Sequence, residues 1–277
     1  MQYMHKLLIC CCLFACSKSG TDAPDSKDTG HTGEVFYPSD YEAGKYRATS
    51  VSLLPTGEGL DLTGDGEIDN VLPAKLPLIN AFTNDDLSFE GMNTSLTESV
   101  ADNTLIVLIE AAYVQGLLKY DVLLGALDES DALSVDAVSL NTDGSPTARF
   151  EGEFLDSVSI QTSADDAGVP FQFMPETPPV LIPMKMARLD GELDNDTTLA
   201  ILGGAIPVEA FVTEVVDPLL PPLEEYDPAN FNGLERDELL QQVRDIANLP
   251  SVSDIELESG ERAFSAALSF EADAITW

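Results

Sequence analysis

Cysteine and histidine are missing from most of this chain. All four cysteines lie within the first sixteen residues, and the only histidines are His5 and His31. The remainder of the sequence therefore offers no disulfide, no thiol nucleophile and no imidazole. Ser-His-Asp and Cys-His catalysis are excluded there, and so are zinc sites built from cysteine or histidine.

Basic residues are scarce as well. The chain has 13 Lys and Arg against 49 Asp and Glu, which gives a formal net charge of −36. Such a chain repels a phosphate backbone or an anionic lipid surface, and no Lys/Arg cluster offsets this repulsion. We therefore expect no nucleic-acid partner. The acidity fits solubility or a salty, calcium-rich exterior, and the alternative is a specific cationic partner.

Long hydrophobic runs are also missing, apart from one at the N-terminus. A short segment ending in Lys6 precedes a nine-residue apolar run from Leu7 to Ala15. A run of this length matches the hydrophobic core of a signal peptide and is too short to span a bilayer as a helix. We therefore expect residues 1–15 to be a signal peptide and the rest of the chain to work outside the cytoplasm.

The end of this run, Leu13-Phe14-Ala15-Cys16, has an aliphatic residue three positions before a cysteine and a small residue directly before it. It resembles the lipobox of bacterial lipoproteins, although Phe14 is larger than the residue usual in that family. The resemblance implies lipidation of Cys16, so that the protein contacts the membrane only through its lipid anchor. In that family Ser17, in place of aspartate, implies transport to the outer membrane, and the membrane face stays open. The alternative is an ordinary secretory signal.

The composition changes twice along the chain and predicts its domain organisation. Residues 16–34 are mostly Ser, Thr, Gly, Asp and Lys, with little to bury, and are typical of a flexible acidic tether. From residue 35 to residue 277 apolar and polar residues alternate or recur at regular spacing, which predicts one globular domain. The Pro-rich stretch 170–183 is interpreted as a loop within it.

Local patterns predict more strands than helices in this domain. Apolar and β-branched runs predict strands at 46–54, 104–113, 120–127, 135–140, 148–154, 158–162, 171–174, 180–193, 198–206 and 263–277. Helical spacing predicts helices at 71–84, 86–101, 207–217 and 234–247. Since strands and helices do not alternate, we expect an α+β fold with an antiparallel, strand-rich curved sheet or sandwich and a few flanking helices.

Two further patterns make the fold prediction more specific. Asn232 and Glu235 have the spacing of a capping box, which predicts the start of the last helix. Large strand side chains are expected to fill the core by themselves, namely those of Leu105, Val107, Ile109, Val122 and Leu124.

One motif carries metal chemistry, the acidic loop from Asp61 to Asn70. Its oxygen-bearing residues alternate, and Gly66 allows a sharp turn. The loop resembles the acidic calcium loops of EF-hand, dockerin and thrombospondin type. The resemblance implies calcium ligands at Asp61, Thr63, Asp65, Glu67 and Asp69.

The loop departs from that family in two places. Thr63 replaces a carboxylate, and Leu72 stands where the bidentate glutamate is expected. The site must then borrow ligands from Glu58, Asn70 or water, and its dissociation constant should be on the order of 10⁻⁴–10⁻³ M. The alternative is an acidic surface turn closed by Asx hydrogen bonds.

These observations favour a non-enzymatic, lipid-anchored cell-envelope protein with a calcium-stabilised fold, which binds a partner or has a structural role. The partner could be a protein, a glycan or a lipid. The first alternative is a lipoprotein that carries an apolar ligand. The second is a secreted hydrolase, but carboxylates are so frequent that no catalytic residue can be singled out.

Overall fold

The computed structural model describes residues 41–80, 88–172 and 178–277, all within one unit that spans Val35–Trp277. The strands are β1 Ala43–Leu53, β2 Val107–Val114, β3 Leu117–Leu127, β4 Leu133–Val135, β5 Arg149–Phe154, β6 Ser159–Phe171, β7 Val180–Leu193, β8 Thr197–Pro207, β9 Ile255–Glu256 and β10 Arg262–Ala274. The helical segments are α1 Leu72–Asn80, α2 Phe89–Ala101, η2 Ala137–Ser139, α3 Val208–Ala210, η3 Phe211–Val216, α4 Asp217–Leu219, η4 Pro228–Phe231 and α5 Arg236–Ala247.

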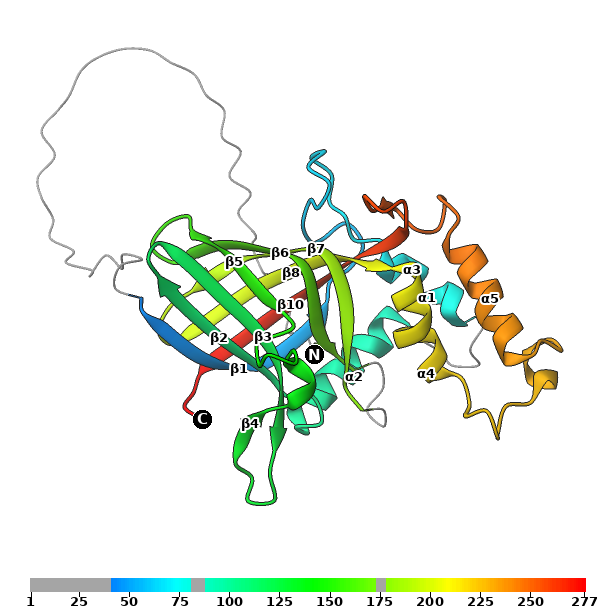
Figure 1. Cartoon of the computed structure of the whole chain (residues 1–277), viewed down its shortest axis with the longest axis horizontal. Helices are drawn as coiled ribbons and strands as arrows, with labels where there is room; N and C mark the ends of the chain where they lie inside the picture. The colour runs from blue at the N-terminus through cyan, green and yellow to red at the C-terminus, as the bar shows by residue number, and fades with distance from the viewer. Residues whose placement is uncertain (1–40, 81–87, 173–177) are drawn as a thin grey trace, which may run out of the picture. The chain divides into compact units, whose positions relative to one another are not determined.

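Eight of the strands close into an antiparallel barrel (Figure 1). Their order is β1-β2-β3-β5-β6-β7-β8-β10, and β10 pairs back with β1, where Ser52 stands opposite Ser269. The short strands β4 and β9 pair with β3 and β10 outside this ring. The expected antiparallel, strand-rich α+β fold is confirmed. The sheet closes on itself, which is a more specific architecture than an open curved sheet or a sandwich.

The strand sequences alternate between the two faces of the barrel wall. In β1, Tyr46 and Ala48 are buried inside, whereas Lys45 is exposed on the outside. This alternation follows from the period of two in an extended strand. It places the charged residues of the wall outside and leaves the interior to apolar and aromatic side chains.

The interior of the barrel is occupied by its own side chains. All five of the predicted core residues are buried in the main cluster: Leu105, Val107, Ile109, Val122 and Leu124. The largest fully buried side chains include those of Tyr41, Tyr46, Tyr120, Phe150 and Phe270. An apolar space of about 20 Å³ remains between the barrel and the helices, beside Leu76, Phe171 and Val215. A space of this size is near the minimum that holds one water molecule.

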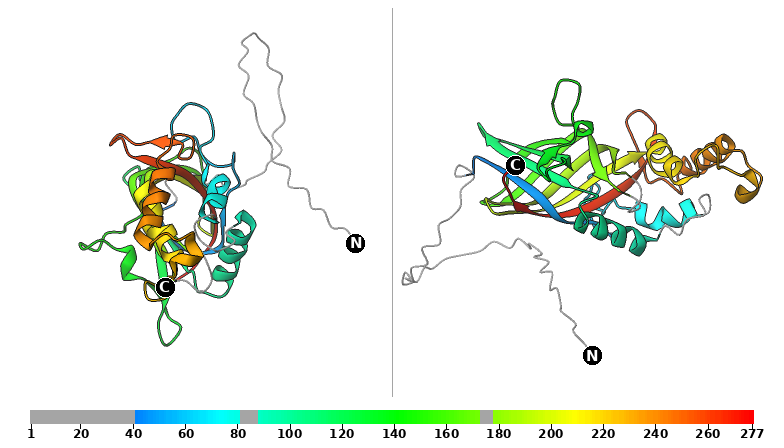
Figure 2. Two further views of the ribbon diagram at one scale, coloured as in Figure 1. Left: turned by 90° about the vertical axis from the view of Figure 1, so that its right-hand side faces the viewer. Right: turned by 90° about the horizontal axis from the view of Figure 1, so that it is seen from below.

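Most helices lie at one end of the barrel, where β8 ends and β10 begins (Figure 1; seen end-on in Figure 2, left). The helical run from α3 to α4 buries Phe211, Val212 and Val216, and the Phe211 ring lies 4.6 Å from that of Phe264. Helix α2 packs along β1 instead. There Asn93 bonds both backbone groups of Leu53, at 2.7 Å and 3.0 Å. In the described part of the chain, no helix is long and apolar enough to cross a membrane.

Two segments differ from the prediction because local hydrogen bonds and pairing outweigh the apolar pattern. The strand predicted at 135–140 is wrong: β4 ends at Val135, and the Asp136 carboxylate accepts the Val138 N–H at 3.0 Å, which starts a 3-10 turn. The loop predicted at 170–183 is wrong at both ends. Pro170 lies in β6 and Pro183 in β7, because the fixed φ of proline suits extended backbone.

The helix ends also differ in detail. Helix α5 begins at Arg236, and the Glu235 N–H donates to the Glu238 carboxylate at 3.1 Å, three residues later than the predicted capping box. Asn232 has a left-handed backbone with φ 56° and ends the preceding 3-10 turn. The strand predicted at 263–277 ends at Ala274. Residues 173 and 174 of the strand predicted at 171–174 lie outside the described residues.

Candidate functional site

The predicted lipidation site, Cys16, lies outside the described residues, as do the signal peptide and the tether. The predicted calcium loop is described in full. It follows β1 and forms a small turn of its own, in which Leu60 and Asp69 pair as an antiparallel bridge. Its geometry can therefore be compared directly with the expected ligand set.

The carboxylate of Asp61 closes the first part of the loop. It accepts the N–H of Gly64 at 2.6 Å and the N–H of Gly66 at 2.8 Å. The bond from Gly66 is the main reason why the pKa of Asp61 lies below its usual value. Both glycines have positive φ, 78° and 90°, so the tight turn depends on residues that adopt this conformation without strain.

Asp69 closes the loop from the other side. One of its oxygens accepts the N–H of Leu62 at 2.7 Å, the N–H of Thr63 at 3.0 Å and the Thr63 hydroxyl at 3.3 Å. Asp65 accepts the Glu67 N–H at 2.9 Å. The predicted ligand residues are therefore brought into one loop, but the carboxylates of its three aspartates bond to the loop backbone. Within the described residues, no group of three or more His, Cys, Asp or Glu side chains is arranged to hold a metal ion.

The loop is fixed to the outer wall of the barrel. Leu60 and Leu62 lie against Gly203 of β8, and Arg188 of β7 donates to the Asp61 carbonyl at 3.4 Å. Asn70 holds the base of the loop, because its amide donates to the carbonyls of residues 54, 55 and 58 at 3.0, 3.0 and 2.8 Å.

Asn70 was one of the residues expected to supply a borrowed ligand. Its side-chain oxygen is buried and has no hydrogen-bond partner among the described residues. Glu58 takes part through its carbonyl, which accepts from Asn70. The loop thus combines free lone pairs with a rigid base, which is compatible with a weak cation site and with a plain Asx-bonded turn.

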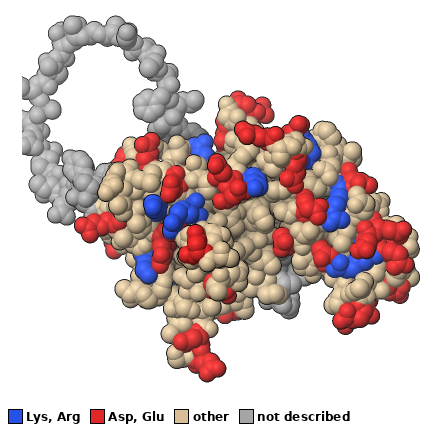
Figure 3. Space-filling model, in the orientation of Figure 1, with Lys and Arg blue, Asp and Glu red and all other residues tan. Residues whose placement is uncertain are grey.

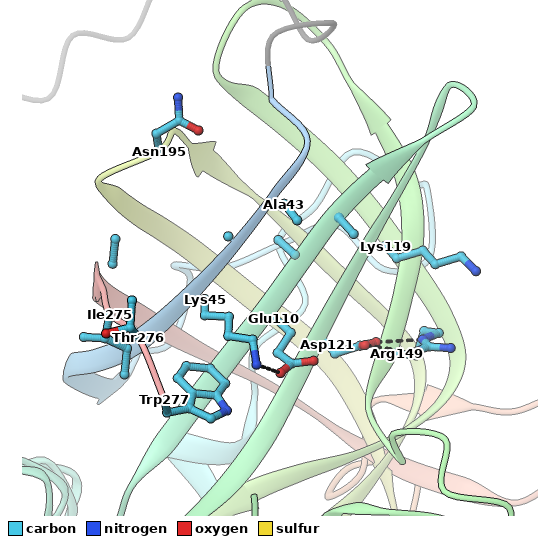
Figure 4. A pocket seen from close by; sticks show the side chains of 14 residues that line it. Ala43, Lys45, Glu110, Lys119, Asp121, Arg149, Asn195, Ile275, Thr276 and Trp277 are labelled. Atoms are coloured by element: carbon cyan, nitrogen blue, oxygen red, sulfur yellow. Dashed lines mark hydrogen bonds and ion pairs between the residues drawn. The ribbon is translucent and has the colours of Figure 1, made fainter. Parts of the chain in front are cut away.

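A second candidate site lies on the outer wall, where β1, β2, β3 and β5 run side by side. We call it the outer groove, and it has a volume of about 660 Å³. It is lined by Ala43, Gly44, Lys45, Glu110, Ala111, Ala112, Lys119, Asp121, Arg149, Asn195, Ala274, Ile275, Thr276 and Trp277 (Figure 4). Small residues form much of this lining and charged residues stand on the wall beside them. This volume is within the range of small-molecule sites.

Four charged residues form one row across the groove. Lys45, Glu110, Asp121 and Arg149 are direct neighbours in the register of β1, β2, β3 and β5. Lys45 contacts Glu110 at 2.9 Å, and Arg149 binds both oxygens of Asp121 at 2.8 Å (Figure 4). The hydrogen bonds to Asp121 raise the pKa of Arg149. Each acidic side chain of the row is therefore matched by a basic one.

Lys119, at the edge of the row, is different. It is half-buried and makes no ion pair or hydrogen bond with any described residue. Every other Lys and Arg of the described chain has such a bond, as in the pairs Lys185–Asp166 and Arg244–Glu209. Glu151 stands opposite Lys119 in the register but forms no ion pair with it. An unpaired ammonium group is unexpected in a chain with a net charge of −36.

Trp277, the one tryptophan of the chain, forms another part of the wall. The Lys45 ammonium lies 4.5 Å from the centre of its ring, a cation–π contact. Trp277 and Ile275 pack against an apolar cluster on the outer face of the barrel, formed by Ile106, Leu108 and Leu123. The tryptophan is thus held in place beside the charged row.

The sequence interpretation missed this groove because each of its residues is ordinary within its own strand. One signal was present: Lys45, Lys119 and Arg149 are basic residues at outward strand positions of a chain in which acidic residues prevail. Figure 3 shows acidic side chains scattered over one face, with basic ones and uncharged surface between them. Comparison of the chain with protein-family models, curated proteins and solved structures gives no match.

Proposed function

We propose that this protein is a non-enzymatic, lipid-anchored protein of the cell envelope that binds its partner on the outer surface of the barrel. The observation that carries this proposal is the filled interior. Tyr46, Tyr120 and Phe150 are buried there at 0 % exposure and occupy the space that a carrier keeps for its ligand. A filled barrel leaves the wall and the loops as the surfaces for recognition.

Hydrogen bonds hold these interior side chains in place. The hydroxyls of Tyr41 and Tyr46 lie 3.0 Å apart, and that of Tyr120 lies 3.1 Å from Thr198 Oγ1, which donates to the Glu192 carbonyl at 3.0 Å. Buried hydroxyls that have hydrogen-bond partners stabilise a packed core. An apolar ligand that pushed these tyrosines apart would leave their hydroxyls without partners. This network supports a structural interior.

In this proposal Cys16 carries the lipid, and the outer membrane is the location. The tether predicted from the sequence at residues 16–34 would then let the barrel reach its partner away from the bilayer. The acidic loop adds calcium-dependent stability: a cation held by Asp61, Asp65 and Asp69, with the Thr63 hydroxyl and the Glu67 carbonyl, would fasten the loop. The main alternative is a carrier of an apolar ligand, which would need more room than the apolar space of about 20 Å³ beside Leu76, Phe171 and Val215.

The full chain with Cys16→Ser tests both parts of the proposal. We expect the variant to leave the membrane fraction, because burial of each acyl methylene contributes about 0.8 kcal/mol to anchoring. Native mass spectrometry and solvent extraction of the purified variant should find no lipid. Membrane association that persists after a high-pH wash would contradict the anchor. A stoichiometric acyl species would contradict the filled interior and favour the carrier.

A further inference from the structure

We propose that the outer groove binds an acidic sugar, whose anionic group is held by Lys119 and Arg149. This inference rests on the proposed function, because it names the partner class for a protein that binds on its outer wall. It starts from the unpaired ammonium of Lys119, described above. An exogenous anion is the partner that this ammonium group lacks within the described chain.

The two basic side chains are placed to hold one anionic group. Lys119 lies on β3 and Arg149 on β5, and their positions are diagonal because Asp121 pairs with Arg149 and Lys119 with Glu151. Diagonal neighbours are roughly 7–8 Å apart, within reach of one carboxylate or phosphate between long side chains. Arg149 uses its Nε and Nη2 on Asp121, which leaves its Nη1 as a free donor.

The other polar groups that line the groove can bind ligand groups besides an anionic one. Glu110 and Asp121 keep acceptor lone pairs after their ion pairs, and ligand hydroxyl groups can donate to them. Asn195, at the opposite rim, makes no hydrogen bond with the described residues and offers both a donor and an acceptor (Figure 4). A ligand with one anionic group and several hydroxyls satisfies these groups together.

The floor of the groove fits the less polar face of a sugar ring. It includes the small side chains of Ala43 and Ala112, which leave room above the backbone, and the Trp277 ring stands beside it. The volume of about 660 Å³ accommodates one or two sugar rings. Three basic side chains line the groove against two acidic ones, and Glu151, which stands opposite Lys119 in the register, is not part of this lining.

Titration of the full chain carrying Cys16→Ser with D-glucuronate tests this proposal. Trp277 is the only tryptophan, so its fluorescence reports on the groove directly. We expect saturable binding with a dissociation constant on the order of a millimolar. D-glucose, which lacks the anionic group, and inorganic phosphate, which lacks the ring and its hydroxyls, should each bind at least about tenfold more weakly.

Variants separate the site from the general surface charge. Lys119→Ala should weaken glucuronate binding about tenfold or more, and Lys119→Arg should keep most of it. Lys185→Ala removes the same charge from β7, where Lys185 pairs with Asp166, and should have no effect. Equal effects of Lys119→Ala and Lys185→Ala, or phosphate binding as tightly as glucuronate, would overturn the proposal. So would a titration with no saturation, and that result would leave the lipid-extraction test of the proposed function unaffected.

Discussion

At the scale of single residues, the turns of this barrel depend on aspartate carboxylates. Asp128, Asp143 and Asp156 each accept the backbone N–H of the residue two positions later, at 2.7, 2.9 and 2.9 Å. These local bonds favour the turn over continued strand. The pKa of each of the three carboxyls lies below its usual value, chiefly because of the Ser130 hydroxyl at Asp128, the Ser145 hydroxyl at Asp143 and the Ser159 N–H at Asp156, with these backbone bonds adding to the effect.

The turn at Asp156 gives a test of pH dependence. Its pKa is lowered chiefly by the N–H of Ser159, at 2.7 Å. A carboxyl with a lowered folded-state pKa stabilises the fold above its unfolded pKa of about 3.9 and loses this contribution as the pH falls through the folded value. Asp156→Asn keeps an acceptor but does not titrate. The parent should therefore be more stable than the variant near neutral pH and lose this advantage in acid.

Urea unfolding at fixed ionic strength, from about pH 7 to about pH 2.5, measures this difference. Glu258→Gln changes the net charge by the same amount without removing a turn hydrogen bond, and it controls for surface charge. A stability difference between the parent and Asp156→Asn that stays constant over the whole range would contradict the explanation.

At the scale of elements, glycine stands where the backbone of a neighbouring strand comes very close. A Cβ atom on Gly152 of β5 would lie 2.1 Å from the Gln161 carbonyl oxygen of β6. A backbone atom cannot move aside as a side chain does, so any larger residue there forces the strands apart. Gly191 of β7 stands in the same relation to the Leu199 carbonyl, at 2.2 Å.

We therefore expect Gly152→Ala to lower the free energy of unfolding by about 1–3 kcal/mol. Gly203→Ala is the matched control, because its Cβ would meet no atom closer than 3.4 Å. Thermal or urea unfolding of the two variants measures the difference. Equal stability of both would show that the close approach at Gly152 does not constrain the barrel.

The acidic loop is the second element with a measurable contribution. If calcium binds only the folded state, a concentration ten times the dissociation constant adds about 1.4 kcal/mol. The melting temperature should then rise by a few degrees at constant ionic strength. Asp65→Ala should abolish this shift, whereas Asp128→Ala, which disrupts a different Asp turn, should keep it. Identical melting curves in calcium and in chelator would identify the loop as a turn only.

The sequence predicted a helix or strand correctly where its local apolar pattern and the tertiary structure favour the same conformation. Strand β7 was expected at its observed bounds, Val180–Leu193, because the run is largely apolar and a turn sequence, Asp194-Asn195-Asp196, follows it directly. Residues 135–140 were not, since a hydrogen bond from Val138 to the Asp136 carboxylate outweighs an apolar run. The acidic loop was recognisable because its residues are contiguous, whereas the outer groove draws single residues from several strands.

At the scale of the whole molecule, closure joins the first and last long strands. Strands β1 and β10 pair from Tyr46–Ala274 to Leu53–Leu268, about 220 residues apart in sequence. A local sequence pattern does not predict the pairing of β1 with β10, because this pairing depends on the register of all eight strands. Closure also removes the two exposed edges that an open sheet would leave for aggregation.

The proposal that the partner binds outside depends on this closed, filled barrel, and amide hydrogen exchange tests it most directly. In a closed barrel, the amides that residues 46–53 and 268–274 direct at each other bond across the β1–β10 seam, and they should exchange as slowly as the paired amides of β2 and β7. In an open sheet both strands would be edges, and about half of their amides would face water. Fast exchange of these seam amides would contradict the account, whereas their protection to the level of the paired amides of β2 and β7 is the result that it predicts.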